Sequence, residues 1–179
     1  VFFQIKDMEF SDLAKMGELY LPLSGIILFI SLGNLEVHKY TWEFVYMRQI
    51  PYVNICAGRL ISVMIFNAIL ILVPVTYAYT KSDYIRFFDG YCGFVVTAWF
   101  LGLLGLLTAE VFRDYKVAYV VTLAYYFVAT SSKQIFKGFQ VFGYIHGSMN
   151  SKNGVFACCL VMAALYLFVV KIKCKHGIV

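Results

Sequence analysis

Side chains able to support catalysis or hold a metal are few in this 179-residue sequence, and they are scattered. The three histidines, His38, His146 and His176, lie far apart in polar segments. The sequence has no HExxH pattern for zinc and no GxxxxGK[ST] loop to cradle a nucleotide phosphate. It therefore predicts no catalytic, cofactor-binding or metal-binding residues, and the chain is not expected to be an enzyme.

One pair of carboxylates has the spacing for joint chemistry. Glu110 and Asp114 stand four residues apart, which would place them on one face of a helix. Arg113 and Lys116 lie beside them, so a solvated ion cluster fits these charges better than a metal site. The five cysteines include no CxxC pair, and they predict neither a zinc site nor a disulfide framework.

The elements that must position any functional residue are membrane-spanning helices. Hydrophobic residues make up 61% of the chain, charged residues 14%, and mean hydropathy is +0.77. A globular domain is roughly 45–50% apolar and about 25% charged, and a soluble core of this size could not bury the excess. We therefore expect an all-α, polytopic membrane bundle forming a single domain over residues 1–179. The net charge of +5 is spread over gaps between apolar runs, which indicates membrane orientation rather than nucleic-acid binding.

Five apolar runs follow residues 1–18, whose mixture of charges and aromatic residues predicts an interfacial helix or an irregular entry segment. Pro74 lies inside the second run and should kink it, as membrane helices tolerate. The interiors of the runs contain no Asp, Lys, Arg or His, so a buried proton relay is not expected. The predicted spans are about 19–35, 60–80, 92–110, 117–131 and 154–171.

Compact basic clusters set the predicted orientation. RDYK at 113–116 and KIKCK at 171–175 adjoin span ends, where the positive-inside rule has most weight. We therefore place these clusters, the carboxyl terminus and the 36–59 loop on the cytoplasmic side of the cell membrane. Residues 132–153 then fall on the outer side. They are rich in Gly and Phe and too polar to span, which predicts a re-entrant or interfacial hairpin.

Small residues line the third span at four-residue spacing. Ala98 pairs with Gly102, and Gly105 pairs with Ala109. This spacing lets helices approach closely. It predicts tight packing either within one chain or across a dimer, and the sequence leaves both open.

The stretch YTWEFVYMRQIP at 40–51 predicts a short helix between the first two spans. Thr41 suits the N-cap, Glu43 the first turn and Arg48 the last turn. A helix of about two turns is marginal in water alone, so the membrane surface or a partner must hold it. Trp, Tyr and Arg are typical of interface hot spots. The residues predicted to dock on a partner are Tyr40, Thr41, Trp42, Glu43, Val45, Tyr46, Arg48 and Gln49.

The order of these features resembles the permease subunit of type-2 ABC exporters (ABC-2 type). The resemblance rests on LGNLE at 32–36, the 40–51 stretch, AGRLIS at 57–62 and LLGLLTAEVFRDYKVAY at 103–119, and it covers roughly residues 19–171. It implies that 40–49 is a cytoplasmic coupling helix and that 132–153 is the outer hairpin. The family has six spans with both termini inside. We therefore expect five spans of a probable six, the first one missing before Val1.

The resemblance also implies partners and a function. Two copies of a separate ABC ATPase would bind ATP and Mg and hydrolyse the nucleotide, and a second permease would complete a homo- or heterodimer in the lipid bilayer. The cargo moved outward would be amphipathic or hydrophobic, possibly a peptide. Two alternatives are a membrane enzyme, which needs a cluster of His or carboxylate residues at one depth, and a non-catalytic scaffold or accessory subunit of another membrane complex. The sequence hardly separates the scaffold from the permease.

Overall fold

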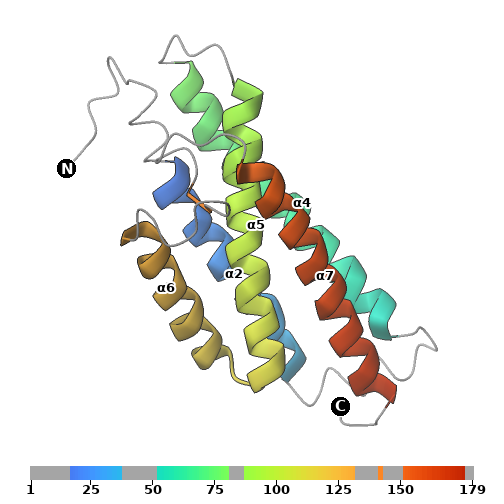
Figure 1. The fold of residues 1–179 in the computed structure, drawn as a ribbon. Coiled ribbons are helices and arrows are strands. Elements are labelled where there is room, and N and C mark those ends of the chain that lie inside the picture. Colours follow the sequence, from blue (N-terminus) through green and yellow to red (C-terminus); the bar gives the residue numbers. More distant parts are fainter. Residues whose placement is uncertain (1–16, 38–51, 81–86, 132–140, 143–150, 176–179) are drawn as a thin grey trace.

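The computed structural model describes residues 17–37, 52–80, 87–131, 141–142 and 151–175. The helices within these residues run alternately in opposite directions and form a bundle (Figure 1). They are α2 (Leu21–Val37), α4 (Tyr52–Tyr79), α5 (Phe87–Phe112), α6 (Tyr115–Ser131) and α7 (Ser151–Lys175).

Three of these helices, α4, α5 and α7, are long and apolar enough to cross a membrane. The predicted class, an all-helical membrane protein, agrees with this finding. Both α2 and α6 have 17 residues, or about 26 Å at 1.5 Å per residue. That is less than the roughly 30 Å of a bilayer's hydrocarbon core. The count of five spans therefore stays a prediction.

The described helices extend beyond the predicted spans. The largest correction is in α4, which begins at Tyr52 rather than near residue 60, so residues 52–59 are helix and not loop. The reason is packing: Cys56 and Leu60 lie on its inner side and are buried in the main core. The helix also continues through Pro74.

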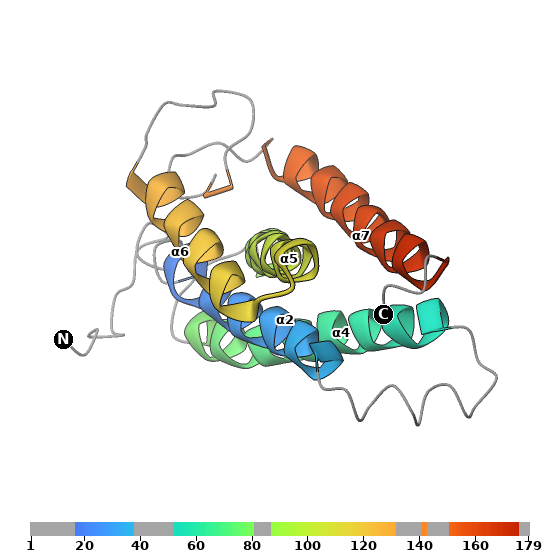
Figure 2. The same ribbon diagram turned by 90° about the horizontal axis from the view of Figure 1, so that it is seen from below.

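Helix α5 is the centre of the bundle and packs against α2, α4, α6 and α7 (Figure 2). Its closest neighbour is α2, and small residues make the approach possible. A Cβ added at Gly25 would overlap the carbonyl oxygen of Ala98. A Cβ at Gly102 would lie 2.6 Å from the ring of Phe29, and one at Gly105 would lie 2.6 Å from Ile30.

A two-residue turn joins α5 to α6. Arg113 has a φ of 54°. This left-handed conformation often ends a helix, and the residue that adopts it is usually glycine. Asp114 follows as the N-cap of α6, and its Oδ1 accepts the backbone N–H of Lys116 at 2.8 Å. The ion cluster expected around Glu110 and Asp114 is thus partly a helix-capping arrangement.

Candidate functional site

The residues predicted to dock on an ATPase, Tyr40 to Gln49, lie outside the described residues. The helices on either side of them are described. Helix α2 ends at Val37 and α4 begins at Tyr52, and both points lie at the same end of the bundle (Figure 1). Helix α5 ends and α6 begins at that end too.

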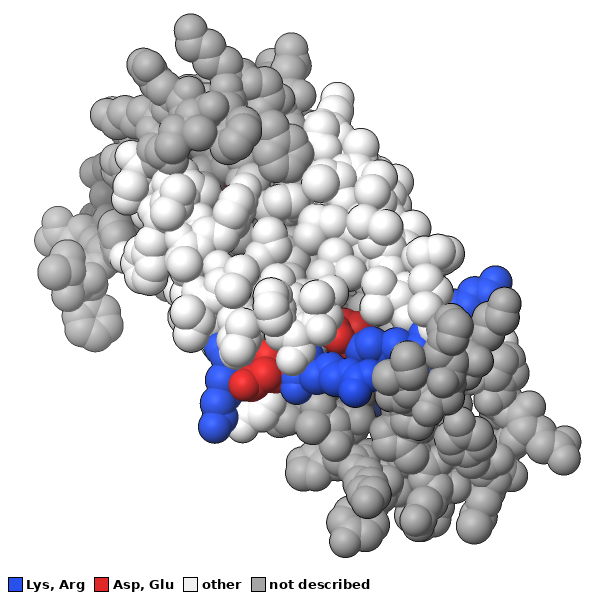
Figure 3. Space-filling view, turned by 60° about the horizontal axis from the view of Figure 1, so that its bottom comes forward, with Lys and Arg blue, Asp and Glu red and all other residues white. Residues whose placement is uncertain are grey.

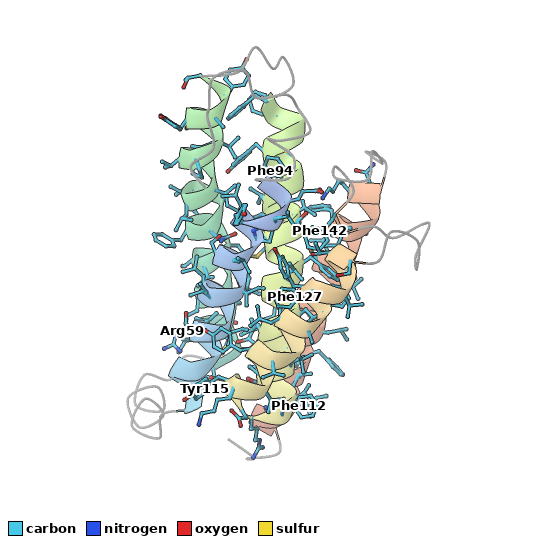
Figure 4. The ribbon with its side chains drawn as sticks, turned by 90° about the vertical axis from the view of Figure 1, so that its left-hand side faces the viewer. Arg59, Phe94, Phe112, Tyr115, Phe127 and Phe142 are labelled. Carbon is cyan, nitrogen blue, oxygen red and sulfur yellow. The ribbon has the colours of Figure 1, made fainter. Side chains whose placement is uncertain are left out.

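Charged side chains gather at this end, which we call the basic end. In Figure 3 they form a band, while the rest of the described surface on that face carries no charge. Figure 4 shows Arg59, Phe112 and Tyr115 together at this end, far from Phe94 and Phe142. The described charges of the basic end are Arg59, Glu110, Arg113, Asp114, Lys116, Lys171 and Lys173.

One ion pair closes the basic end of the bundle. The ammonium of Lys173, near the end of α7, lies 2.5 Å from Glu110 Oε1. The same ammonium donates to the Glu110 backbone carbonyl at 2.6 Å. That carbonyl belongs to the last turn of α5, where a cation is favoured by the helix dipole. Lys173 therefore caps the carboxyl end of α5 and links α7 to α5.

A second ion pair is buried at the opposite end. The ammonium of Lys152, at the start of α7, lies 2.5 Å from Oε1 of Glu18, a residue just before α2 that is fully buried. The ammonium also donates to Thr97 Oγ1 and to the Val141 carbonyl, both at 2.8 Å. An ammonium has three N–H donors, and these three acceptors use all of them.

Aromatic and backbone contacts enclose this buried cluster. Phe142 is 2% exposed, and Tyr126 of α6 meets it edge-on with ring centroids 5.6 Å apart. The Tyr126 hydroxyl donates to the Leu19 carbonyl at 2.7 Å. Val141 and Phe142 belong to the predicted outer hairpin at 132–153, whereas its last residues, 151–153, form the first turn of α7 instead. The rest of that stretch lies outside the described residues. That hairpin stays a prediction.

The depth of the buried pair can be counted along α5. Thr97 precedes Arg113 by sixteen residues, a rise of about 24 Å. With Arg113 at one boundary of a hydrocarbon core of roughly 30 Å, Thr97 would lie inside the other boundary. In such a membrane the pair would fall at a depth where charges are rare and are matched with one another.

This cluster was not predicted from the sequence, where Glu18 falls at the end of the predicted interfacial helix or irregular entry segment. In the structure Gly17 to Leu19 form a helical turn and Glu18 is 0% exposed, so the Glu18 side chain is packed inside the bundle. The position of Lys152 becomes clear only from the fold. Once α7 is extended to Ser151, Lys152 stands three residues before buried Val155 and seven before buried Cys159, which is the spacing of one helix face.

A third polar contact joins α2 to the middle of α4. Asn67 is fully buried, and its Nδ2 donates to Ser24 Oγ at 3.0 Å. Such bonds hold membrane helices together. An Asn within an apolar run of this length was a readable signal that the sequence analysis left unused.

Three of the predicted helix-packing residues, Ala98, Gly102 and Gly105, lie on the face of α5 that meets α2, and the fourth, Ala109, is buried in the main core. Ala98 is 0% exposed and Ala109 is 7% exposed, and Gly102 and Gly105 face Phe29 and Ile30 as described above. The stripe is therefore occupied within one chain. Among the described residues, no group of three or more His, Cys, Asp or Glu side chains is placed to hold a metal.

Comparisons with known proteins identify no relative. No protein-family model matches the chain, and neither a curated protein nor a solved structure matches it. Function must therefore be argued from the arrangement of the helices and their charges.

Proposed function

We propose that this chain is the permease subunit of an ATP-driven exporter and moves an amphipathic or hydrophobic cargo, possibly a peptide, out of the cell. ATP would be hydrolysed on a separate subunit. One observation carries the proposal: α2 ends and α4 begins at the basic end of the bundle. The stretch YTWEFVYMRQ joins them, so its two anchor points lie on the side that the positive-inside rule makes cytoplasmic.

The bundle offers a way to transmit motion from that side. An ATPase that pushed the 40–49 segment would act on α2 and α4 together. Helix α2 is pressed on α5 through Gly25 and Ala98, and Asn67 bonds α4 to Ser24 of α2. A displacement at the basic end would therefore reach the buried Glu18–Lys152 pair through connected, tightly packed helices.

Crosslinking tests the proposal. A variant with Tyr46→Cys, made after Cys92 and Cys174 are replaced by Ser, is purified from its native membrane and crosslinked. We expect capture of a chain that binds ATP and carries the phosphate-loop motif. Tyr20→Cys is the matched control, because Tyr20 is 57% exposed at the other end of α2 and should capture no ATPase.

A second measurement ties the contact to function. We expect Trp42→Ala with Arg48→Ala to abolish stimulation of the captured ATPase while the bundle stays folded. If Tyr46→Cys captures no ATP-binding chain and is labelled only by reagents dissolved in lipid, the permease proposal fails. The hypothesis of a scaffold or accessory subunit of another membrane complex would then replace the permease proposal.

A further inference from the structure

A cavity of about 610 Å³ lies between α4, α5 and α7, away from the basic end. Its volume is in the range of small-molecule sites. The residues that matter for its chemistry are Ala68 of α4, Tyr91 and Trp99 of α5, and Lys152, Asn153 and Phe156 of α7. Neither the basic end nor the small-residue stripe contributes to it.

The lining changes from polar to apolar with depth. Counted from Arg113, Tyr91 lies 22 residues along α5 and Trp99 lies 14, or about 33 Å and about 21 Å. With a hydrocarbon core of roughly 30 Å, Tyr91 stands at the far boundary and Trp99 well inside it. On α7, which begins at Ser151, Asn153 lies in the first turn and Phe156 lies about one turn deeper. This gradient matches a molecule with its polar head at the membrane surface and its tail toward the centre.

The cavity can be reached from the side of the bundle. Helices α4 and α7 lie close at the basic end and spread apart toward the other end (Figure 2). Phe156 is 43% exposed, and Asn153 is exposed on the same wall. A ligand dissolved in the bilayer could therefore enter between α4 and α7 without crossing the packed core around α5.

The charges of the lining residues indicate which charge the polar head of a ligand should carry. Lys152 is the one charged side chain among the lining residues that the structure describes. Its ammonium already donates to Glu18, Thr97 and Val141, and the Glu18 charge balances it. An anionic head would thus meet no unbalanced cation. The Asn153 amide and the Tyr91 hydroxyl, which donates to the Ala68 carbonyl and can still accept, offer neutral hydrogen bonds.

We infer that this cavity binds a single-chain lipid with a neutral, hydrogen-bonding head, of the monoacylglycerol class, taken from the bilayer. The head contacts Asn153 and Tyr91, and the chain lies against Trp99 and Phe156. The site is independent of any ATPase, so its failure would leave the proposed export function standing.

Trp99 itself reports binding. The sequence has two tryptophans, so Trp42→Phe leaves Trp99 as the sole indole. This variant is placed in phosphatidylcholine vesicles and titrated with a chain-brominated monoacylglycerol, which quenches indole fluorescence on contact. We expect saturable quenching at low mole fraction that unbrominated monoacylglycerol reverses. Quenching that only rises in proportion to mole fraction would mean ordinary lipid contact and would overturn the inference.

Two matched variants locate the quenching in the cavity. Ala68→Phe fills the cavity from α4 and should weaken monoacylglycerol binding roughly tenfold or more. Ala157→Phe adds the same ring at an exposed position of α7 outside the lining and should leave binding unchanged. Equal binding by both variants, each shown to be folded by its helical circular dichroism, would place the site elsewhere.

Head-group preference tests the charge argument. A chain-brominated fatty acid, in its anionic form, should bind roughly tenfold more weakly than the monoacylglycerol. Asn153→Lys adds an unbalanced cation at the rim and should reverse this order. Equal affinity of the unmodified cavity for both probes would refute the neutral-head assignment.

Discussion

Two lysine–glutamate pairs close the bundle at opposite ends, and they differ in their surroundings. In both pairs the Nζ–Oε1 distance is 2.5 Å. The side chains of Lys173 and Glu110 are 20% and 13% exposed. Those of Lys152 and Glu18 are 9% and 0% exposed. The first pair lies in a band of other charges, whereas the ammonium of the second lies against the Thr97 hydroxyl and the Val141 carbonyl.

The same chemistry therefore has two different consequences. A partly exposed pair contributes little to stability, because water already solvates its charges. A buried pair costs several kcal/mol to desolvate, and it survives only when its geometry and remaining hydrogen bonds are complete. Lys152 meets that condition with three acceptors. We expect the Glu18–Lys152 pair to fix how α7, α5 and the start of α2 meet, and the Glu110–Lys173 pair mainly to cap α5.

The largest expected effect comes from breaking the buried pair. Lys152→Met removes the ammonium and leaves the Glu18 carboxylate buried without its cation. Removing one partner of a buried pair typically costs about 3–5 kcal/mol. We expect a loss of this size in the free energy of unfolding, measured by detergent-induced unfolding in mixed micelles and followed by circular dichroism.

Removal of both charges distinguishes the loss of charge compensation from the loss of packing at this site. Glu18→Gln combined with Lys152→Met leaves no unmatched charge, so we expect most of the lost stability to return. A double variant as unstable as Lys152→Met alone would show that packing rather than charge compensation is lost at this site.

A smaller effect should follow from disturbing the close contact of α2 and α5 near the buried pair. Gly25 lies against Ala98, the residue that follows Thr97 in α5. Gly25→Ala would push its methyl group into the Ala98 carbonyl, and overpacking of this kind costs roughly 1–3 kcal/mol. Mixed-micelle unfolding of this variant should show a loss in that range.

Gly58 gives the matched control for this substitution. A Cβ at Gly58 meets no atom within 4 Å, and alanine is a better helix former than glycine by about 1 kcal/mol. Gly58→Ala in α4 should therefore be neutral or stabilising. A loss at Gly58 equal to that at Gly25 would mean that helix flexibility, not the α2–α5 contact, decides both results.

The sequence predicted the helical membrane class because class depends on composition and run length alone. The apolar runs from 92–110 and 154–171 lie within α5 and α7, and the small residues of α5 mark a close helix contact. The predicted ends were less accurate. A polar residue such as Arg59 was read as the end of a run, yet a helix continues past it wherever its inner face stays buried, as at Cys56.

The buried pair could not be predicted, because its partners come together only in three dimensions. Glu18 and Lys152 are separated by most of the chain, and each adjoins an apolar run where a charge is usually solvated. Helix α7 is apolar on all sides apart from its ends, so the sequence does not show which face is inner. Only the fold places Lys152 on the buried face with Val155 and Cys159.

The smallest expected loss in the free energy of unfolding is at the Glu110–Lys173 pair of the basic end. Lys173→Met removes the cation from Glu110, but Glu110 is partly exposed and can be solvated. We expect a loss of about 1 kcal/mol, from the ion pair and from the cap on the Glu110 carbonyl. Lys171→Met is the control, because Lys171 is exposed two residues away, and it should change the unfolding free energy by less. If Lys173→Met cost as much as Lys152→Met, burial would not be what distinguishes the two pairs.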